Sequence, residues 1–186
     1  MGENSSAAAV RPLLRVHQVR KFTDAPVEPA ALDAIADAAR WSGSSGNSQP
    51  WRFIVIREPE TLRQLSESSM PSTRSLATAA AAMAIVLPKE KGTAVSNAYD
   101  EGRAAERILI AAYLLGLGAG IAWVKADDRA EVGELLGLPA DRFVRTLVAI
   151  GHPTAKASTP KSTHGEARLP RSETVFSERW GGSQEG

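Results

Sequence analysis

The sequence predicts a mixed α+β fold, because strand-like and helix-like segments are interspersed along a chain of ordinary domain length. Short apolar runs typical of strands occupy residues 53–56, 82–87, 119–124 and 143–150. Apolar residues at helical spacing mark residues 29–40 and 96–115. With 43% hydrophobic residues among 186, the chain is long enough for one domain with a substantial core.

The first half of the chain is expected to start with a disordered stretch, residues 1–14, which is small and polar. A helix follows over residues 29–40, with Pro29 suited to its first turn. The run 53–56 does not alternate, which indicates a strand covered on both faces and therefore central in the sheet. A short helix over 59–66 and a second strand, stopped by Pro88, come next.

The second half contains the longest helical pattern, residues 96–115, which Gly116 is placed to terminate. Its many alanines permit close packing, as in a buried or interface helix. A strand over 119–124, a helix over 127–136 and a last core strand over 143–150 follow. Residues 174–176 resume a strand-like pattern after a long polar arm.

Charge and composition exclude several classes of function. A net charge of +1 and 5% aromatic residues do not suit a nucleic-acid surface. The absence of cysteine excludes disulfides and thiolate chemistry, and the three histidines lack metal-ligand spacing, so no metal site is expected. No segment has the apolar length of a signal peptide or a membrane span, so we expect a cytoplasmic protein that does not contact membranes.

The most informative stretch is WSGSSGNSQPWRF, residues 41–53. Ser44, Ser45 and Asn47 supply short hydrogen-bonding groups, and Gln49 can pair with an imide-like edge. Glycines at 43 and 46 let the backbone approach a flat ligand closely. The stretch could also be a simple connector between a helix and a strand, because its residues are typical of turns.

Motifs for other chemistries are missing. The chain has neither a Gly-x-Ser-x-Gly elbow nor a Walker-type Gly-Lys-Ser/Thr, and its acidic pairs sit near helix starts, where they complement the helix dipole. Gly116, Gly118 and Gly120 do not make a dinucleotide fingerprint, because they follow a helix and Ile121 replaces the third glycine. Few side chains are left for acid, base or nucleophile work, which is typical of a cofactor-driven reaction. We therefore predict no catalytic side chain.

Three segments resemble the nitroreductase family. The Asn-x-Gln-Pro-Trp of residues 47–51 is similar to the family's flavin-binding loop, with Gly43 where that loop usually has proline. HQVRKFTDAPV (17–27) resembles the Arg-Arg-Ser-x-Arg-x-Phe opening that holds the flavin phosphate, although His17 replaces an arginine and Gln18 the serine. AAYLLGLGAGIAWV (111–124) resembles the family's alanine-rich helix and the strand after it.

The resemblance covers residues 15–180 as one FMN-binding domain, followed by a disordered tail at 181–186. It implies a nitroreductase-like fold: a central mixed, mainly antiparallel sheet flanked by helices, with the C-terminal segment exchanged in a homodimer whose active site lies at the interface. The cofactor-binding residues that it implies are His17, Gln18, Arg20, Ser44, Ser45, Asn47, Gln49, Gly118 and Arg168. Arg74, Lys161 and Arg171 are further candidates, and Trp51, Trp123 and Trp180 are expected to be packing residues.

The activity implied is an FMN-dependent oxidoreductase that takes hydride from NADH or NADPH. It would reduce a small, flat, electron-poor acceptor, such as a nitroaromatic or a quinone, by a ping-pong mechanism. Another flavin or a deazaflavin remains an alternative to FMN. Alternative functions are a noncatalytic flavin-binding or dimer-scaffold protein, and family activities such as dehydrogenation, dehalogenation or flavin breakdown.

Overall fold

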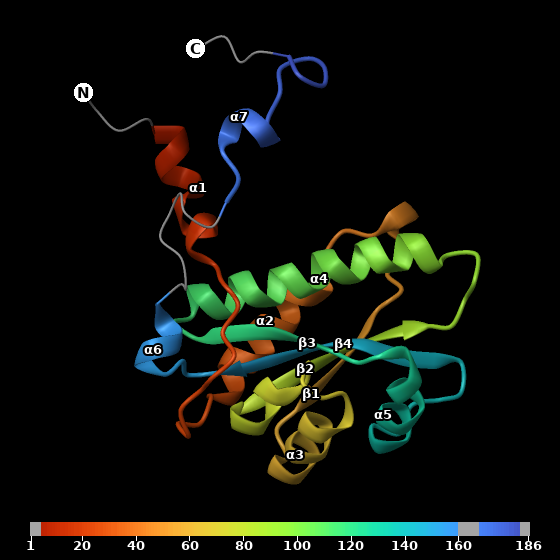
Figure 1. Cartoon of the computed structure of the whole chain (residues 1–186). Coiled ribbons are helices and arrows are strands. Elements are labelled where there is room, and N and C mark those ends of the chain that lie inside the picture. The colour runs from red at the N-terminus through yellow and green to blue at the C-terminus, as the bar shows by residue number, and fades with distance from the viewer. Residues whose placement is uncertain (1–4, 160–167, 183–186) are drawn as a thin grey trace.

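A computed structural model of the chain describes residues 5–159 and 168–182. Four antiparallel strands form one sheet in the order β1-β2-β4-β3 (Figure 1). The strands are β1 (Arg52–Ile56), β2 (Ala81–Pro88), β3 (Gly118–Trp123) and β4 (Arg142–Gly151). The helices are α1 (Ser5–Arg15), α2 (Pro29–Arg40), α3 (Pro59–Ser68), α4 (Ala94–Leu114), α5 (Arg129–Leu135), α6 (Ala155–Ser158) and α7 (Arg171–Thr174). Short 3₁₀ turns are η1 (Ser45–Asn47), η2 (Arg74–Thr78) and η3 (Ala126–Asp128).

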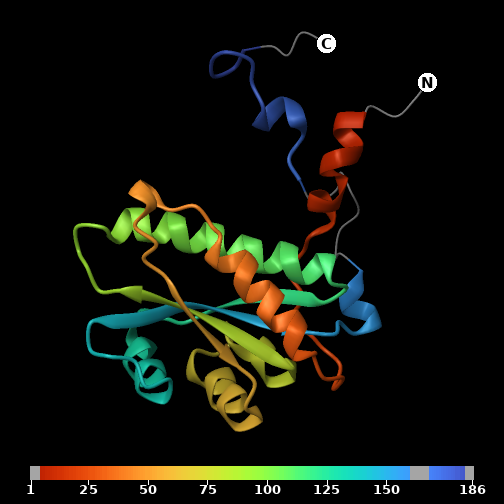
Figure 2. The same cartoon turned by 180° about the vertical axis from the view of Figure 1, so that it is seen from behind.

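The central strand β2 explains the layers, because its residues alternate between two cores. Met83 and Ile85 pack with α2 and α4 on one face of the sheet. Ala82 and Ala84 pack with α3 and α5 on the other face. Both faces are therefore covered, which accounts for the non-alternating apolar sequence of the strand, and Figures 1 and 2 show the helices on either side.

The long helix α4 lies against the sheet through its small residues. Ala104, Ala105 and Ala112 are buried with Ile108 between them, so the helix backbone comes close to the strands. The opposite side of α4 is exposed and carries large apolar residues, including Tyr99 and Leu114. This helix is therefore buried on one side only in the single chain.

The strand order corrects one prediction. The run 53–56 is a strand, but β1 is at the edge of the sheet and not in its centre. Phe53 packs in one core and Ile54 in the other, which explains the apolar run. An apolar run in the sequence indicates that both faces of a strand are covered. It does not indicate whether another strand pairs with each of its two edges. All strand pairs among the described residues are antiparallel, whereas the resemblance implies a mixed, mainly antiparallel sheet.

The two ends of the chain also differ from prediction. The stretch 1–14 is expected from its sequence to be disordered, but its described part, residues 5–14, lies in α1, whose composition of alanine and leucine favours a helix. Residues 174–176, expected to be strand-like, lie at the end of α7 and beyond it, and pair with no strand in the described part of the chain. Both helices lie apart from the sheet and close to one another (Figures 1 and 2). Within the described ranges no helix is long and apolar enough to cross a membrane.

Candidate functional site

A cavity of about 720 Å³ opens beside the edge strand β3. Its volume lies in the range of ligand pockets, about 300–1,000 Å³. Four separate parts of the chain form it: the segment after α1, the start of η2, the strand β3, and α6 with its flanks. Its lining residues are His17, Gln18, Arg20, Lys21, Pro71, Ser72, Arg74, Ser75, Ile121, Trp123, Thr154, Lys156, Ala157 and Thr159. We call it the basic cavity.

The N-terminal wall, residues 17–23, is fixed by backbone hydrogen bonds. Val19 donates to the carbonyl of Ala119 at 2.8 Å, and Thr23 donates to that of His152 at 2.8 Å. Gly120 permits this contact, since a Cβ atom there would lie 2.0 Å from the carbonyl oxygen of Val19. These backbone contacts hold residues 17–23 against β3 and β4. Arg20 and Lys21 therefore line the basic cavity.

The lining of the basic cavity is strongly positive. Among the described residues it includes Arg20, Lys21, Arg74 and Lys156 and no carboxylate. None of these four cations forms an ion pair with another described residue. Unpaired guanidinium and ammonium groups around one hollow suit an anionic ligand, and arginine in particular matches phosphate oxygens.

His17 and Gln18 line the cavity but already have hydrogen-bond partners in the chain. The two ring nitrogens of His17 lie 3.0 and 3.2 Å from the carbonyl oxygens of Arg15 and Ala157. The side-chain oxygen of Gln18 accepts the N–H of Ile121 at 2.7 Å. Both residues therefore hold the wall together, and the free positive charges on it are those of Arg20 and Lys21.

Ser75 and Trp123 line the cavity but are not among the site residues predicted from the sequence. Ser75 is 5% exposed, and its hydroxyl has no hydrogen-bond partner. Trp123, expected to be a packing residue, is 47% exposed on the cavity wall. Trp51 is buried as predicted, whereas Trp180 is almost fully exposed. A signal for Trp123 existed in its position on a strand next to a glycine-rich turn.

Arg145, Glu101 and Arg129 form a charged cluster next to Trp123. The guanidinium of Arg145 lies 5.5 Å from the centroid of the Trp123 ring and is paired with the buried carboxylate of Glu101. Arg129 lies close by, over the ring of Phe143. Burial lowers the pKa of Arg129 below its usual value, and the charge of Arg145 lowers it further.

The polar loop, residues 43–49, has an unusual backbone. Gly46, Asn47 and Gln49 all have positive φ angles, of 55°, 54° and 47°. Such angles are uncommon outside glycine and are frequent at functional sites. The hydroxyl of Ser44 accepts the N–H of Gln49 at 2.9 Å and so closes the loop. The side chains of Asn47 and Gln49 are left exposed.

A carboxylate on helix α4 holds the polar loop in place. The buried carboxylate of Asp100 accepts the N–H of Ser45, with oxygens at 3.0 and 3.2 Å, and lies 3.7 Å from Arg103. The guanidinium of Arg103 lies over Gly43, where a Cβ atom would approach it to 2.1 Å. An added methyl at position 43 would therefore have to displace the end of the flexible Arg103 side chain.

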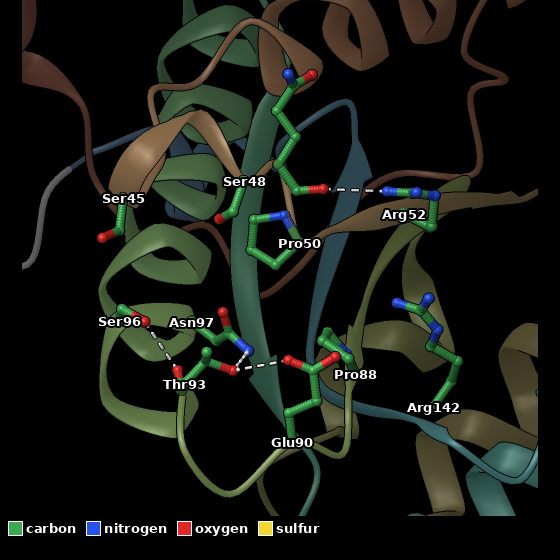
Figure 3. A pocket seen from close by; sticks show the side chains of 11 residues that line it. Ser45, Ser48, Pro50, Arg52, Pro88, Glu90, Thr93, Ser96, Asn97 and Arg142 are labelled. Carbon is green, nitrogen blue, oxygen red and sulfur yellow. Dashed lines mark hydrogen bonds between the residues drawn. The ribbon is translucent and has the colours of Figure 1, made fainter.

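The polar loop borders a second cavity, of about 350 Å³, which is separate from the basic cavity. Arg52 and Arg142 lie on the same side of it, while Thr93 bonds to Asn97 and Glu90 across its floor (Figure 3). The two cavities share no lining residue, so a single chain does not bring Ser45 and Gln49 to the same cavity as Arg20. The loop packs on the α4 side, whereas η2 belongs with α3 on the other side.

The remaining predicted site residues lie elsewhere. Gly118 packs against Val19. A Cβ atom added at position 118 would lie 2.8 Å from the Cγ1 atom of Val19. Arg168 and Arg171 are exposed on the C-terminal arm, and neither lines the described cavities. Lys161 lies outside the described residues. Arg74, held only as a further candidate, lines the basic cavity.

Comparisons with known proteins agree with the fold. The model of the nitroreductase family matches residues 17–97, which include the N-terminal wall, Ser75 and the polar loop. A provisionally named NADH dehydrogenase/NAD(P)H nitroreductase of Archaeoglobus fulgidus is 32% identical over 141 residues, which cover 73% of this chain and 79% of the relative. An NADH dehydrogenase of Thermus thermophilus is 28% identical, over 75% of this chain and 84% of its own length.

Solved structures are similar over a larger share of this chain. An FMN-dependent nitroreductase from Clostridium difficile is 27% identical, with a TM-score of 0.78 over 90% of this chain and 98% of the other. A provisionally named nitroreductase from Desulfovibrio desulfuricans, solved in complex with FMN, is 26% identical, with a TM-score of 0.74 over 91% and 98% of the two chains. The whole fold is therefore shared.

Proposed function

The chain belongs to the nitroreductase family, and we propose that it binds FMN in the basic cavity and reduces small acceptors with NADH or NADPH. When bound, FMN would supply the redox chemistry, taking hydride from the nicotinamide and passing it to a flat, electron-poor nitroaromatic or quinone in a ping-pong sequence. The chain's own residues bind the cofactor, orient it and exclude water. The observation that carries this proposal is a cavity of ligand size whose described lining has cations without ion-pair partners and no carboxylate.

The residues of the basic cavity fit FMN in several respects. Arg20, Lys21 and Lys156 provide positive charge for the phosphate, and each charge-assisted hydrogen bond contributes roughly 1.5–3 kcal/mol. Arg74 lines the cavity from η2 and would place a cation near the ring, where it would favour electron uptake. Ser75 lines the same cavity, and its buried hydroxyl has no hydrogen-bond partner among the described residues. The family's relatives solved with FMN support this choice of cofactor.

We further propose that a second copy of the chain completes the site. The polar loop has exposed amide groups on Asn47 and Gln49, but it lies away from the basic cavity of its own chain. A symmetric dimer can place the loop of each protomer over the basic cavity of the other. The separation of the two parts in one chain supports a cofactor groove built from both chains.

Exposed apolar surface supports the same dimer. Trp41 at the end of α2 and Val95, Tyr99 and Leu114 on α4 are large apolar residues that the single chain leaves exposed, and three of them are at least 70% exposed. A second copy packed against α4 would bury apolar surface of this kind. Both termini also project apolar residues, namely Leu13 and Leu14 on α1 and Val175 and Trp180 on the C-terminal arm.

The edge strand β1 offers a place for the exchanged C-terminal arm. Only β2 pairs with β1 among the described residues, so its other edge has unpaired backbone groups. The extended residues after α7, beginning at Val175, have the apolar character of a strand and lie away from their own sheet. If the C-terminal arms are exchanged, Arg168 of each arm would lie on the other protomer, where it is a candidate for binding the FMN phosphate.

Reconstitution with FMN followed by anaerobic reduction tests the proposed function. The purified protein should take up FMN and turn yellow, and NADH or NADPH should then bleach it before an added quinone restores the colour. Stable colour after addition of either nucleotide would support the alternative, a noncatalytic flavin-binding protein. A protein that does not bind FMN at any concentration contradicts both.

A further inference from the structure

The hydroxyl of Ser75 has a position that no internal hydrogen bond explains. Ser75 is the second residue of η2, is 5% exposed, and lies on the wall of the basic cavity. Its Oγ atom is buried and has no partner. Buried hydroxyls are normally hydrogen-bonded, and leaving one unpaired is destabilising.

Neighbouring serines show that this part of the chain normally satisfies such groups. In α3, Ser66 donates to the carbonyl of Arg63 at 2.7 Å, and Ser68 donates to that of Leu65 at 2.9 Å. Ser69 donates to the carboxylate of Asp128. Serine in a helix usually makes a bond of this local kind. Ser75 makes none. Three other buried polar atoms, on Ser42, Glu101 and Arg129, also lack a partner among the described residues, but only Ser75 lines the basic cavity, so a ligand of that cavity is available as its partner.

The distribution of charge indicates which part of a flavin would reach Ser75. The wall made by residues 17–23 and α6 holds three cations, Arg20, Lys21 and Lys156, whereas the η2 wall holds only Arg74. The doubly charged phosphate belongs at the more positive wall. The ring then lies towards η2, and its carbonyl and imide edge offers both acceptors and a donor, either of which suits a hydroxyl.

We propose that Ser75 is a cofactor-binding residue, whose hydroxyl hydrogen-bonds to the polar edge of the flavin ring beside Arg74. The proposal rests on the proposed function, since it requires FMN in the basic cavity. It adds a contact that is specific to the ring, in contrast to the charged contacts at the phosphate. Ser75 thus contributes to binding of the ring, while Arg20 and its neighbours determine the preference for a phosphorylated tail.

Titration of the flavin-free protein with FMN and with riboflavin tests this assignment. Riboflavin has the same ring and lacks the phosphate. Ser75→Ala should raise the dissociation constants of both ligands by a similar factor, about 3- to 10-fold, the value of one neutral hydrogen bond. Arg20→Ala should weaken FMN and leave riboflavin almost unchanged. Ser75→Cys, nearly isosteric but a weak donor, should follow Ser75→Ala.

Ser66→Ala is the matched control, because it removes a buried serine hydroxyl that does not line the cavity. It should leave both dissociation constants unchanged. Unchanged affinity for FMN in Ser75→Ala and Ser75→Cys, with normal binding by the wild type, overturns the role of Ser75 alone. A loss confined to FMN overturns the assignment to the ring. A loss of dimer in sedimentation, in place of weaker flavin binding, places the partner of Ser75 in the other subunit and also overturns it. Failure of the wild type to bind FMN contradicts the proposed function itself.

Discussion

The carboxylate of Asp100 receives the backbone N–H of Ser45 through both oxygens, at 3.0 and 3.2 Å. This contact joins the polar loop to the middle of the longest helix, and Asp100 itself is 2% exposed. An ionised acceptor strengthens such a bond. The shape of the loop therefore depends on a residue 55 positions away in sequence.

Removal of this acceptor should destabilise the fold. Asp100→Ala leaves the N–H of Ser45 without its partner, and we expect a loss of about 1.5–3 kcal/mol in the free energy of unfolding. Urea denaturation of the flavin-free protein measures it. Asp37→Ala removes an exposed carboxylate paired with Arg40 and should cost less than about 0.5 kcal/mol. Equal losses for the two variants would show that the Asp100 contact is not special.

The contact between Gly43 and Arg103 should make their substitutions non-additive. An added methyl at position 43 must displace the Arg103 guanidinium, which lies at the end of a flexible chain. In the Arg103→Ala background the space is free, and Gly43→Ala should then stabilise the fold by about 0.4–1 kcal/mol through the unfolded state. In the wild-type background this gain should vanish or reverse. A double-mutant cycle by urea denaturation gives the coupling, and simple additivity would disprove the contact.

Gly120 should be necessary for docking of the N-terminal wall. Gly120→Ala places a methyl group against the carbonyl oxygen of Val19, a backbone atom that cannot rotate away. We expect a loss of about 1–3 kcal/mol in stability and weaker FMN binding, because Arg20 moves with the wall. Gly133→Ala, where the nearest atom to the new methyl is 4.0 Å away, should instead stabilise α5 by about 0.5–1 kcal/mol. Thermal melts with and without FMN compare the two variants.

The phosphate assignment predicts a selective loss of cofactor. Arg20→Ala and Arg168→Ala should each weaken FMN binding by about 1.5–3 kcal/mol, or roughly tenfold and more. Arg63→Ala, which removes an exposed guanidinium already paired with Glu60 and Glu67, is the control and should leave FMN binding unchanged. Equilibrium titration monitored by flavin fluorescence supplies the constants. Unchanged affinity in both test variants would refute the assignment.

The parts of the fold that could be predicted from sequence are those with a local physical signature. Apolar runs and helical spacing identify all four strands of the described sheet and the helices α2 to α5. The buried face of each element determines which nearby positions in the sequence are apolar. The polar loop could also be recognised, because its glycine, asparagine and serine residues are contiguous. The edge position of β1 could not, since it depends on which strands pair.

The basic cavity was only partly accessible to sequence reasoning. His17, Gln18 and Arg20 lie in one motif, whereas Ser75 and Lys156 come to the same cavity from positions far along the chain. Nothing in a single sequence distinguishes the orphaned hydroxyl of Ser75 from those of the satisfied serines around it. The use of His17 and Gln18 as structural contacts likewise became apparent only with the docking of their segment on β3.

The central claim, that each cofactor site combines the basic cavity of one protomer with the polar loop of the other, can be tested by mixing two defective variants. Arg20→Ala damages the cavity, and Asn47→Ala with Gln49→Ala damages the loop, so homodimers of either variant should bind FMN poorly. In a mixed dimer one site then receives both defects and the other receives none. Co-expression with two affinity tags, followed by FMN titration of the doubly purified dimer, should therefore recover one site of wild-type affinity per dimer. Weak binding at every site of the mixed dimer would contradict the claim, because it is the result expected when cavity and loop serve the same protomer.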